Sequence, residues 1–335
     1  MSCQQGFTVS ATPKDLERAF ELLHLYFTAP NRDETAFQNL KSRIQATIVN
    51  KAQNPEALFA DRVPVVNRSN HYSAEPWTTA KLARADLDQA LSFYRECFEN
   101  AQEFTFFIVG NITLESLKPL LEKYLASLPR GERRLTAVKN MGLQFPGGIV
   151  KEDVKKGREP KALTLITWPA LTGMEDALSF RLRKACDVLE MRLLDIFREQ
   201  LGKTYSVSVE WSPDAPGTEY ATTAVSFGSA PEQVGSMVSR ALEEIEKFKA
   251  EGPTEKELAA VKEQEVRQEE VSLKQNGFWA GALANYHALK RDPGTINDRI
   301  KRARDLSADD VKAAAARFFA RTNYTVLTLT PETKE

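Results

Sequence analysis

Histidine and cysteine are the side chains best suited to metal or nucleophilic chemistry, and this sequence holds three of each. His24, His71 and His287 lie far apart, and the chain contains no His-x-x-x-His, His-x-x-Glu-His or His-Glu-x-x-His. Because zinc needs clustered ligands, a self-contained zinc hydrolase site is not expected. The sequence therefore predicts no metal ligand on this chain.

The individual cysteines and histidines are likewise predicted to have no chemical role. Cys97 and Cys186 fall inside amphipathic helical patterns, which predicts buried free thiols, and no Cys-x-x-Cys pair is present. His24 and His287 lie in helical patterns and His71 in a polar loop, so each is expected to be structural or solvated. No Gly-x-Ser-x-Gly and no glycine-rich phosphate loop occurs.

Composition excludes further classes. The 335 residues predict about two domains, and 45 basic against 46 acidic residues give a net charge of −1. That balance argues against a nucleic-acid-binding protein. The longest strongly apolar stretch, Phe104–Val109, is far too short to span a membrane, and Met1–Gln5 is too short and polar for a signal peptide.

In the first region, one apolar segment at each end is expected to form a strand, Gly6–Ala11 and the buried Phe104–Val109. Helical patterns with capping residues fill the space between them. The expected helices follow Thr12-Pro13, Asp33-Glu34, Asn54-Pro55 and Asp86, and a last one runs from Thr113 to about Leu128.

The second region begins with strands and ends with helices and a strand. The expected strands are Ile149–Lys155, Ala162–Trp168, Thr204–Trp211, Glu219–Phe227 and Tyr324–Thr330. The expected helices are Glu175–Gln200, Pro231–Ala250, Thr254–Lys274, Asn276–Lys290 and Ser307–Ala320.

These two regions repeat one order of elements. Pro13 corresponds to Pro231 at an offset of 218 residues, and Asn54 corresponds to Asn276 at an offset of 222. Phe104-Thr-Phe corresponds to Tyr324-Thr-Val at an offset of 220. Three nearly equal offsets predict two structurally homologous domains.

The second copy carries about 70 additional residues at its start, roughly Ile149–Ser212, which the first copy lacks. We therefore expect a first domain at residues 1–130 that is truncated at its beginning, a linker at 131–148 and a second domain at 149–335. A truncated domain would leave a sheet edge and apolar helix faces uncovered.

At Arg198-Glu-Gln-Leu-Gly-Lys-Thr-Tyr205 the sequence resembles the pitrilysin/insulinase family of zinc metallopeptidases, and large bacterial members in particular. Phe7–Glu17, Phe104–Asn111 and Leu128-Pro129 are also similar to recurrent segments of that family, so the likeness covers essentially the whole chain. It implies an α+β fold of two homologous αβ-roll domains of the metallopeptidase/processing-peptidase type. Their sheets would be mostly antiparallel, with helices on one face.

The same resemblance implies that zinc is a cofactor of a parent enzyme and not of this chain. Family members bind zinc in an N-terminal half through His-x-x-Glu-His and a later Glu, whereas the C-terminal half helps to bind substrate. The counterpart of the motif helix, Glu175–Gln200, contains no histidine, and Thr35–Gln53, where the third ligand would fall, contains no carboxylate. Both domains are therefore expected to be inactive.

Arg198 and Tyr205 are the substrate-binding residues that the resemblance implies. In the family, an Arg and a Tyr seven residues apart face the zinc across the cavity and hydrogen-bond the substrate. Here Arg198 would end a helix, Gly202 would allow the reversal and Tyr205 would begin the returning strand. Without the resemblance, a structural role would explain both residues: the helix dipole would favour Arg198 near the end of its helix, and Tyr205 would pack on a face of the sheet.

Other candidates carry simpler interpretations. Glu263, Glu265, Glu269 and Glu270 are expected to form a solvated helix face. Trp211 and Phe227 would be sheet core or line a peptide surface, with core favoured. The strand Glu219–Phe227 is a candidate for addition of an extended peptide.

The leading hypothesis is a substrate-binding, non-catalytic half of a zinc endopeptidase that degrades peptides or unstructured polypeptides inside a clamshell cavity. Its partners would be such a peptide and a zinc-bearing N-terminal half, with no nucleic acid and no membrane span. Two alternatives are a non-peptidase scaffold subunit and a separate subunit that pairs with a zinc-bearing chain. Bacterial relatives imply a periplasmic or envelope location in a Gram-negative cell.

Overall fold

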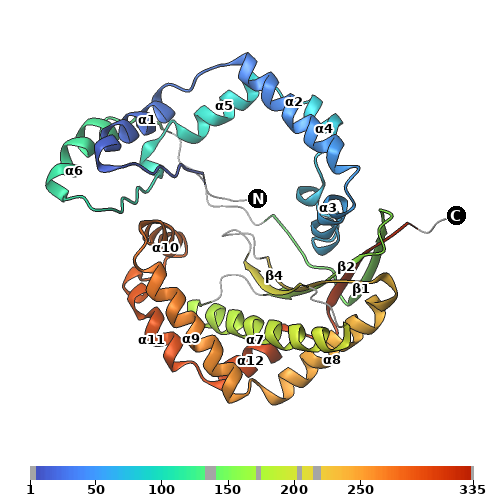
Figure 1. The fold of residues 1–335 in the computed structure, drawn as a ribbon. Helices are drawn as coiled ribbons and strands as arrows, with labels where there is room; N and C mark the ends of the chain where they lie inside the picture. The colour runs from blue at the N-terminus through green and yellow to red at the C-terminus, as the bar shows by residue number, and fades with distance from the viewer. Residues whose placement is uncertain (1–4, 133–140, 171–174, 202–205, 214–219, 333–335) are drawn as a thin grey trace.

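The structure, a computed structural model, describes residues 5–132, 141–170, 175–201, 206–213 and 220–332. Helices and one sheet form two lobes that together make a ring (Figure 1). This arrangement confirms the expected α+β class. Within the described ranges, no helix combines the length and the apolar character needed to cross a bilayer.

The first lobe is helical. Side chains of Asp33, Asn54, Asp86 and Thr113 accept hydrogen bonds from the first turns of four of its helices, as their positions in the sequence predicted. A π-helical turn, Leu121–Leu125, follows the last helix. The helices are α1 (Leu16–Thr28), α2 (Glu34–Lys51), α3 (Pro55–Asn67), α4 (Thr79–Ala83), α5 (Leu87–Phe98) and α6 (Leu114–Leu120).

The second lobe contains the sheet. Its helices are α7 (Asp176–Leu201), α8 (Val234–Glu251), α9 (Glu255–Ser272), α10 (Asn276–Ala288), α11 (Arg299–Asp305) and α12 (Ala308–Phe318). Its strands are β1 (Ile149–Lys155), β2 (Ala162–Ala170), β3 (Val207–Pro213), β4 (Ala221–Ser229) and β5 (Tyr324–Thr330).

The strand order is β1-β5-β2-β4-β3. β1 and β5 are parallel, and the other neighbours are antiparallel, so the sheet is mostly antiparallel as expected. One face packs against α7, α8 and α12 around the largest core, which includes Ile166, Trp168 and Phe227. Helices therefore cover this face as the fold prediction required.

The opposite face carries a helix from the other lobe. Phe59 and Val66 of α3 pack with Leu327 and Leu329 of β5, and all four side chains are buried. Figure 1 shows α3 beside the β1–β2 side of the sheet. α3 of the first lobe is thus packed on the sheet of the second lobe.

Two expected strands are absent from the first lobe. Residues 6–11 and 104–109 are extended, but within the described ranges they are not part of any sheet, so the prediction of strands there was wrong. A strand needs a hydrogen-bonded neighbour. Instead, aromatic packing holds both segments: Phe7 stacks on Phe98 and Phe27 meets Phe104, each at 4.9 Å between ring centroids.

The internal repeat is visible in the order of elements. Both regions have a proline-initiated 3₁₀ turn followed by five helices in the same order. The helices α1, α2, α3, α4 and α5 correspond to α8, α9, α10, α11 and α12. α2, α3 and α5 each begin 221 residues before α9, α10 and α12. The expected homology of the two regions therefore extends to individual helix starts.

Gly157, in the turn between β1 and β2, tests the fit of α3 against the sheet. Its φ is +90°, and a Cβ built there would lie 2.9 Å from Cγ of Pro55. We expect Gly157→Ala to lower the free energy of unfolding by the left-handed backbone cost, about 1–2 kcal/mol, plus about 1–3 kcal/mol for crowding Pro55. Urea unfolding followed by circular dichroism measures the sum of these two costs.

Gly148→Ala is the matched control, because its φ is +78° but nothing lies within 4 Å of its Cβ position. It should cost only the backbone contribution. Equal costs for the two variants would contradict the close packing of α3 on this turn.

Candidate functional site

Arg198 lies in the last turn of α7, and its side chain is exposed. Tyr205 and Gly202, the other residues of the expected site, lie outside the described residues. The proximity of Arg198 and Tyr205 therefore remains a prediction.

The end of α7 that bears Arg198 is anchored to the start of β3. Phe197 is buried and meets Phe227 of β4 edge-on at 5.0 Å between ring centroids. Phe227 is in turn the register partner of Val207, the first residue of β3. Arg198 thus leaves the helix at the same end of the sheet at which the chain re-enters after residue 205.

α7 is held by apolar contacts on most of its surface. Its buried side chains recur at helical spacing and belong to the main core, so the helix has little freedom to rotate or slide. They are Phe180, Leu182, Ala185, Cys186, Val188, Leu189, Leu193 and Phe197. Cys186 is a buried free thiol as predicted, and burial raises its pKa.

Two buried cations of α7 fix neighbouring helices. Lys184 Nζ lies 2.6 Å from Glu265 Oε2 of α9 and 2.5 Å from Asp187 Oδ2. Arg192 donates to both carboxylate oxygens of Glu257 at 2.7 and 2.8 Å and to Glu244 at 3.2 Å. These pairs set the positions of α8 and α9 along α7.

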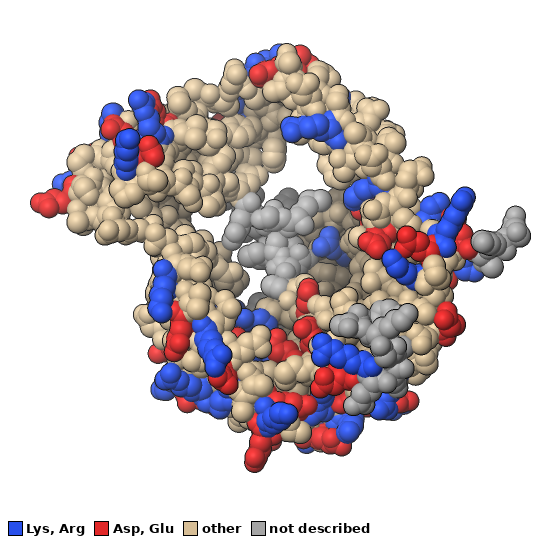
Figure 2. All heavy atoms as spheres, in the orientation of Figure 1, with Lys and Arg blue, Asp and Glu red and all other residues tan. Residues whose placement is uncertain are grey.

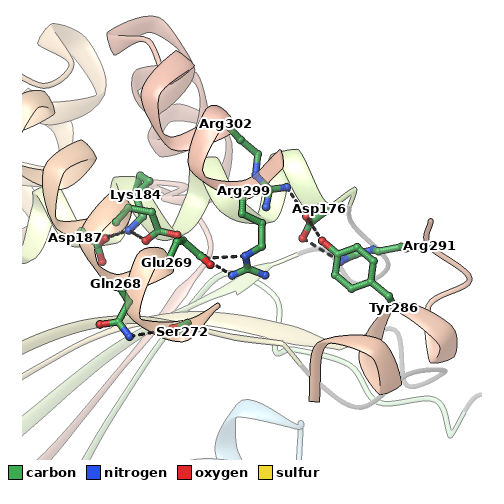
Figure 3. Close-up of polar contacts among 11 residues, drawn as sticks. Asp176, Lys184, Asp187, Gln268, Glu269, Ser272, Tyr286, Arg291, Arg299 and Arg302 are labelled. Atoms are coloured by element: carbon green, nitrogen blue, oxygen red, sulfur yellow. Dashed lines mark hydrogen bonds and ion pairs between the residues drawn. The ribbon is translucent and has the colours of Figure 1, made fainter. Parts of the chain in front are cut away.

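The N-terminal end of α7 carries a second group of charges (Figure 3). Asp176 accepts from Tyr286 at 2.8 Å, from Arg291 at 3.2 Å and from Arg302. Burial alone would raise the pKa of Asp176, but Arg302, Tyr286 and Arg291 outweigh it and hold that pKa below its usual value. A carboxylate at a helix N-terminus is also favoured by the helix dipole.

The acidic residues of α9 were expected on a solvated face, and for two of them this prediction was wrong. Glu265 and Glu269 are buried, and Glu269 accepts from Arg299 Nε at 2.8 Å (Figure 3). Glu263 is exposed and pairs with Arg267 on the surface, as expected. Lys184 lies four residues from both Phe180 and Val188, on the buried side of α7, and this position was the signal that a buried acidic partner would be needed.

Strand addition at Glu219–Phe227 is not possible in this fold, because β4 lies between β2 and β3. The edges of the sheet are β1 and β3. On β3, the N–H of Val209 donates to Glu190 Oε2 of α7 at 2.8 Å. This carboxylate occupies one of the donors that an added strand would need.

Trp211 and Phe227 belong to the core. Phe227 is buried, and Trp211 packs against the same cluster from the edge strand. The core interpretation of these two aromatics, which the sequence favoured over a peptide-lining role, is confirmed.

The three histidines are held in three separate places. His24 Nδ1 contacts the Tyr124 carbonyl at 2.9 Å, His71 Nε2 the Met141 carbonyl at 3.0 Å and His287 Nε2 the Thr105 hydroxyl at 3.1 Å. In the part of the chain that the structure describes, no three His, Cys, Asp or Glu side chains are grouped to hold a metal ion. These residues do not fit a zinc site.

The space-filling view shows an opening between the two lobes (Figure 2). Lysine, arginine, aspartate and glutamate gather mainly over the outer helices of the second lobe, with both signs mixed (Figure 2). Such a surface has no single-sign field that would attract a polyanion.

Arg192 is the residue whose loss should most disturb α7. We expect Arg192→Met to lower the free energy of unfolding by about 3–5 kcal/mol, because the buried Glu244 would keep an unpaired charge and the part-buried Glu257 would lose its bidentate partner. Arg240→Met, at an exposed pair with Glu243, should cost less than about 1 kcal/mol. Equal costs would contradict the role assigned to Arg192.

The pH dependence gives a second test of this pair. Burial would raise the pKa of Glu257, but hydrogen bonds from Arg192 and Thr254 hold it below its usual value. A carboxylate whose pKa is lower in the folded protein than in the unfolded chain stabilises the fold at pH values above the unfolded pKa. This stabilisation is lost as the pH falls through the folded pKa. The difference in unfolding free energy between the wild type and Arg192→Met should therefore shrink from pH 7 to pH 4.

Comparisons with known proteins agree with this architecture. A family model described as "Peptidase M16 inactive domain" matches residues 84–265. A "Zinc protease PQQL-like" of Arabidopsis thaliana is 25% identical over 95% of this chain and 36% of its own length. The crystal structure of the periplasmic protease PqqL from Escherichia coli superposes with a TM-score of 0.79, at 22% identity, over 95% of this chain and 35% of that one.

The first half of the same Escherichia coli protein also matches, with a TM-score of 0.72 and 11% identity, over 96% of this chain and 72% of that one. At these identities the structural likeness concerns the fold alone. The chain spans about a third of the length of the curated relative described above. The family model covers more than half of the chain and extends across both lobes, so the chain belongs to the peptidase M16 inactive-domain family.

Proposed function

We propose that this chain is the substrate-binding, non-catalytic part of a zinc-dependent endopeptidase that degrades peptides or unstructured polypeptides. The family match carries this proposal, because it identifies an inactive domain and the curated relative is a zinc protease. The described residues do not fit zinc, so the metal would be bound in an N-terminal half of the parent protein.

Arg198 and Tyr205 are the proposed contacts to the substrate. The exposed guanidinium of Arg198 offers a fixed fork of donors to a peptide carbonyl or carboxylate, and the buried Phe197 beside it holds the last turns of the helix in place. A tyrosine hydroxyl two residues before β3 would add one more donor near the same point. Donors fixed before the substrate arrives stabilise developing charge most effectively.

The proposed location is the periplasm or envelope of a Gram-negative cell. It is supported by the Escherichia coli relative, which is a periplasmic protease. We extend that location to this chain together with the function.

Peptide hydrolysis tests the assignment. This chain alone should show no turnover with zinc present, and mixing it with a zinc-bearing N-terminal half should give chelator-sensitive turnover. Turnover by the chain alone that a chelator abolishes would overturn the proposal. A mixture that assembles but never hydrolyses peptide would favour a scaffold role.

Substitutions in the active mixture test the two residues. We expect Arg198→Ala and Tyr205→Phe each to lower kcat/KM by about 10- to 100-fold, because each removes a donor to the bound substrate. Arg240→Ala removes an exposed arginine from the outer helix α8 and should leave kcat/KM unchanged. Full activity in both site variants would remove their proposed role.

We also propose that the chain has two units, residues 1–130 and 149–335 joined by a linker at 131–148, and that strands from the parent protein complete the first unit. The repeat supports this: β4 and β5, the counterparts of residues 6–11 and 104–109, both pair with β2. The counterpart of Ala314 on α12, which is 1% exposed, is Phe93 on α5, which is 61% exposed. Phe93 thus lacks the cover that α7 gives α12.

Hydrogen exchange of residues 104–109 tests the completion of the first unit. In the parent protein these amides should exchange at least 10-fold more slowly than in the isolated chain, because a sheet partner would protect them. The amides of β5 serve as the control and should be protected in both. Equal exchange at 104–109 in the two proteins would contradict the proposal.

A further inference from the structure

The face of the sheet opposite α7 is only partly covered by α3. On β3, Val207, Val209 and Trp211 pack into the core with α7, so the residues between them point to the opposite face. α3 packs on that face over β1, β2 and β5. Figure 1 shows the β4 side of the sheet turned toward the opening of the ring. We call the β3–β4 part of this face the β3–β4 shelf, and its residues are Ser208, Glu210, Ser212, Thr222, Ala224 and Ser226.

Glu210 is the one charged residue of the β3–β4 shelf, and the other five side chains are small. Its register partner on β4 is Ala224, and the pairs on either side consist of serine and threonine. Glu210 itself is exposed. A long side chain of a ligand can therefore lie across the shelf and reach this carboxylate.

The carboxylate of Glu210 has no cationic partner in the part of the chain that the structure describes. Its hydrogen bond comes from Ser208 Oγ, which donates to Oε1 at 2.8 Å. Glu190, which accepts from the N–H of Val209 at the edge of β3, also forms no ion pair with a described residue. By contrast, the buried carboxylates around α7 are paired with lysine or arginine. The shelf thus offers negative charge to a cationic group of a ligand.

The β3–β4 shelf begins at the end of α7 that bears Arg198. Phe197 contacts Phe227, and the register partner of Phe227 is Val207, the first residue of β3. Glu210 lies three residues further along β3, about 10 Å from that end at about 3.4 Å per residue. An extended peptide covers the same distance with about three residues.

We infer that Glu210 is a specificity-determining residue that selects a basic side chain in the bound polypeptide. A peptide held at Arg198 through a carbonyl or carboxylate places a lysine or arginine, about three residues away, against Glu210. The inference rests on the proposed function, because it names the class of peptide that the same site takes. Glu210 contacts the substrate away from the cleaved bond and takes no part in the cleavage.

A charged residue on an edge strand also has a simpler use, because it hinders pairing with the edge of another sheet. Either sign of charge serves that purpose, so Glu210→Lys would preserve it. Selection of a basic side chain requires a negative charge. Reversal of the charge therefore separates the two roles.

Competition between two peptides in one reaction tests the inference in the active mixture of this chain with its zinc-bearing half. The peptides are neutral and identical, except that one has lysine where the other has glutamine, and this position is moved in turn through five residues on each side of the cleaved bond. The measured ratio of the two kcat/KM values does not depend on how much of a variant folds or assembles. We expect the wild type to favour the lysine peptide about three-fold at its best position, the effect of one exposed ion pair. The preference should shrink at 0.5 M salt.

Substitutions at Glu210 assign the preference to this residue. Glu210→Gln should bring the ratio to about one, and Glu210→Lys should bring it below one. Glu243→Gln, at an exposed position of α8, is the matched control and should keep the wild-type ratio.

A wild-type ratio of one at every position would overturn the inference, and so would a preference for lysine that survives in both Glu210 variants. In either case, turnover of the glutamine peptide that Arg198→Ala lowers would leave the proposed function standing. An assembled wild-type mixture that hydrolyses neither peptide would contradict the proposed function, and the inference with it.

Discussion

The structure depends on the burial of one long helix with its charges. α7 has 26 residues and is about 39 Å long, and the sheet and three helices cover most of it. Lys184 and Arg192 enter the core with it, and each is neutralised by carboxylates from α8 or α9. Because a buried charge without its partner is costly, these pairs tolerate few alternative positions of the helices.

Contacts at both ends of α7 fix the position of the candidate site. Asp176 at one end of α7 ties it to α10 and α11, and Phe197 at the other end locks it to β4. Arg198 therefore projects from a rigid element and not from a loop, which is how a binding group is held before its ligand arrives. The same helix connects the candidate substrate contact to α10, the helix that meets the other lobe.

Much of the fold could be predicted from local signals. Capping side chains placed the helix starts, alternation placed β3 and β4, and the offsets near 220 indicated two related units. The predictions that were wrong depend on contacts between residues far apart in the sequence. Residues 6–11 and 104–109 have strand-like sequences, but pairing depends on a neighbour that a local pattern cannot supply. Glu265 and Glu269 look like surface residues until Lys184 and Arg299 are brought to them. The place of β4 inside the sheet is likewise a matter of strand order, which alternation does not determine.

The central claim is that polypeptides bind at the Arg198 end of α7, and photo-crosslinking tests it most directly. A photoreactive phenylalanine analogue would replace Arg198 in one sample and the exposed Arg267 on the outside of α9 in another. The account predicts that an unfolded peptide crosslinks at position 198 and that excess unlabelled peptide competes it away, with only background at position 267. Equal crosslinking at the two positions, or none that competes, would contradict it.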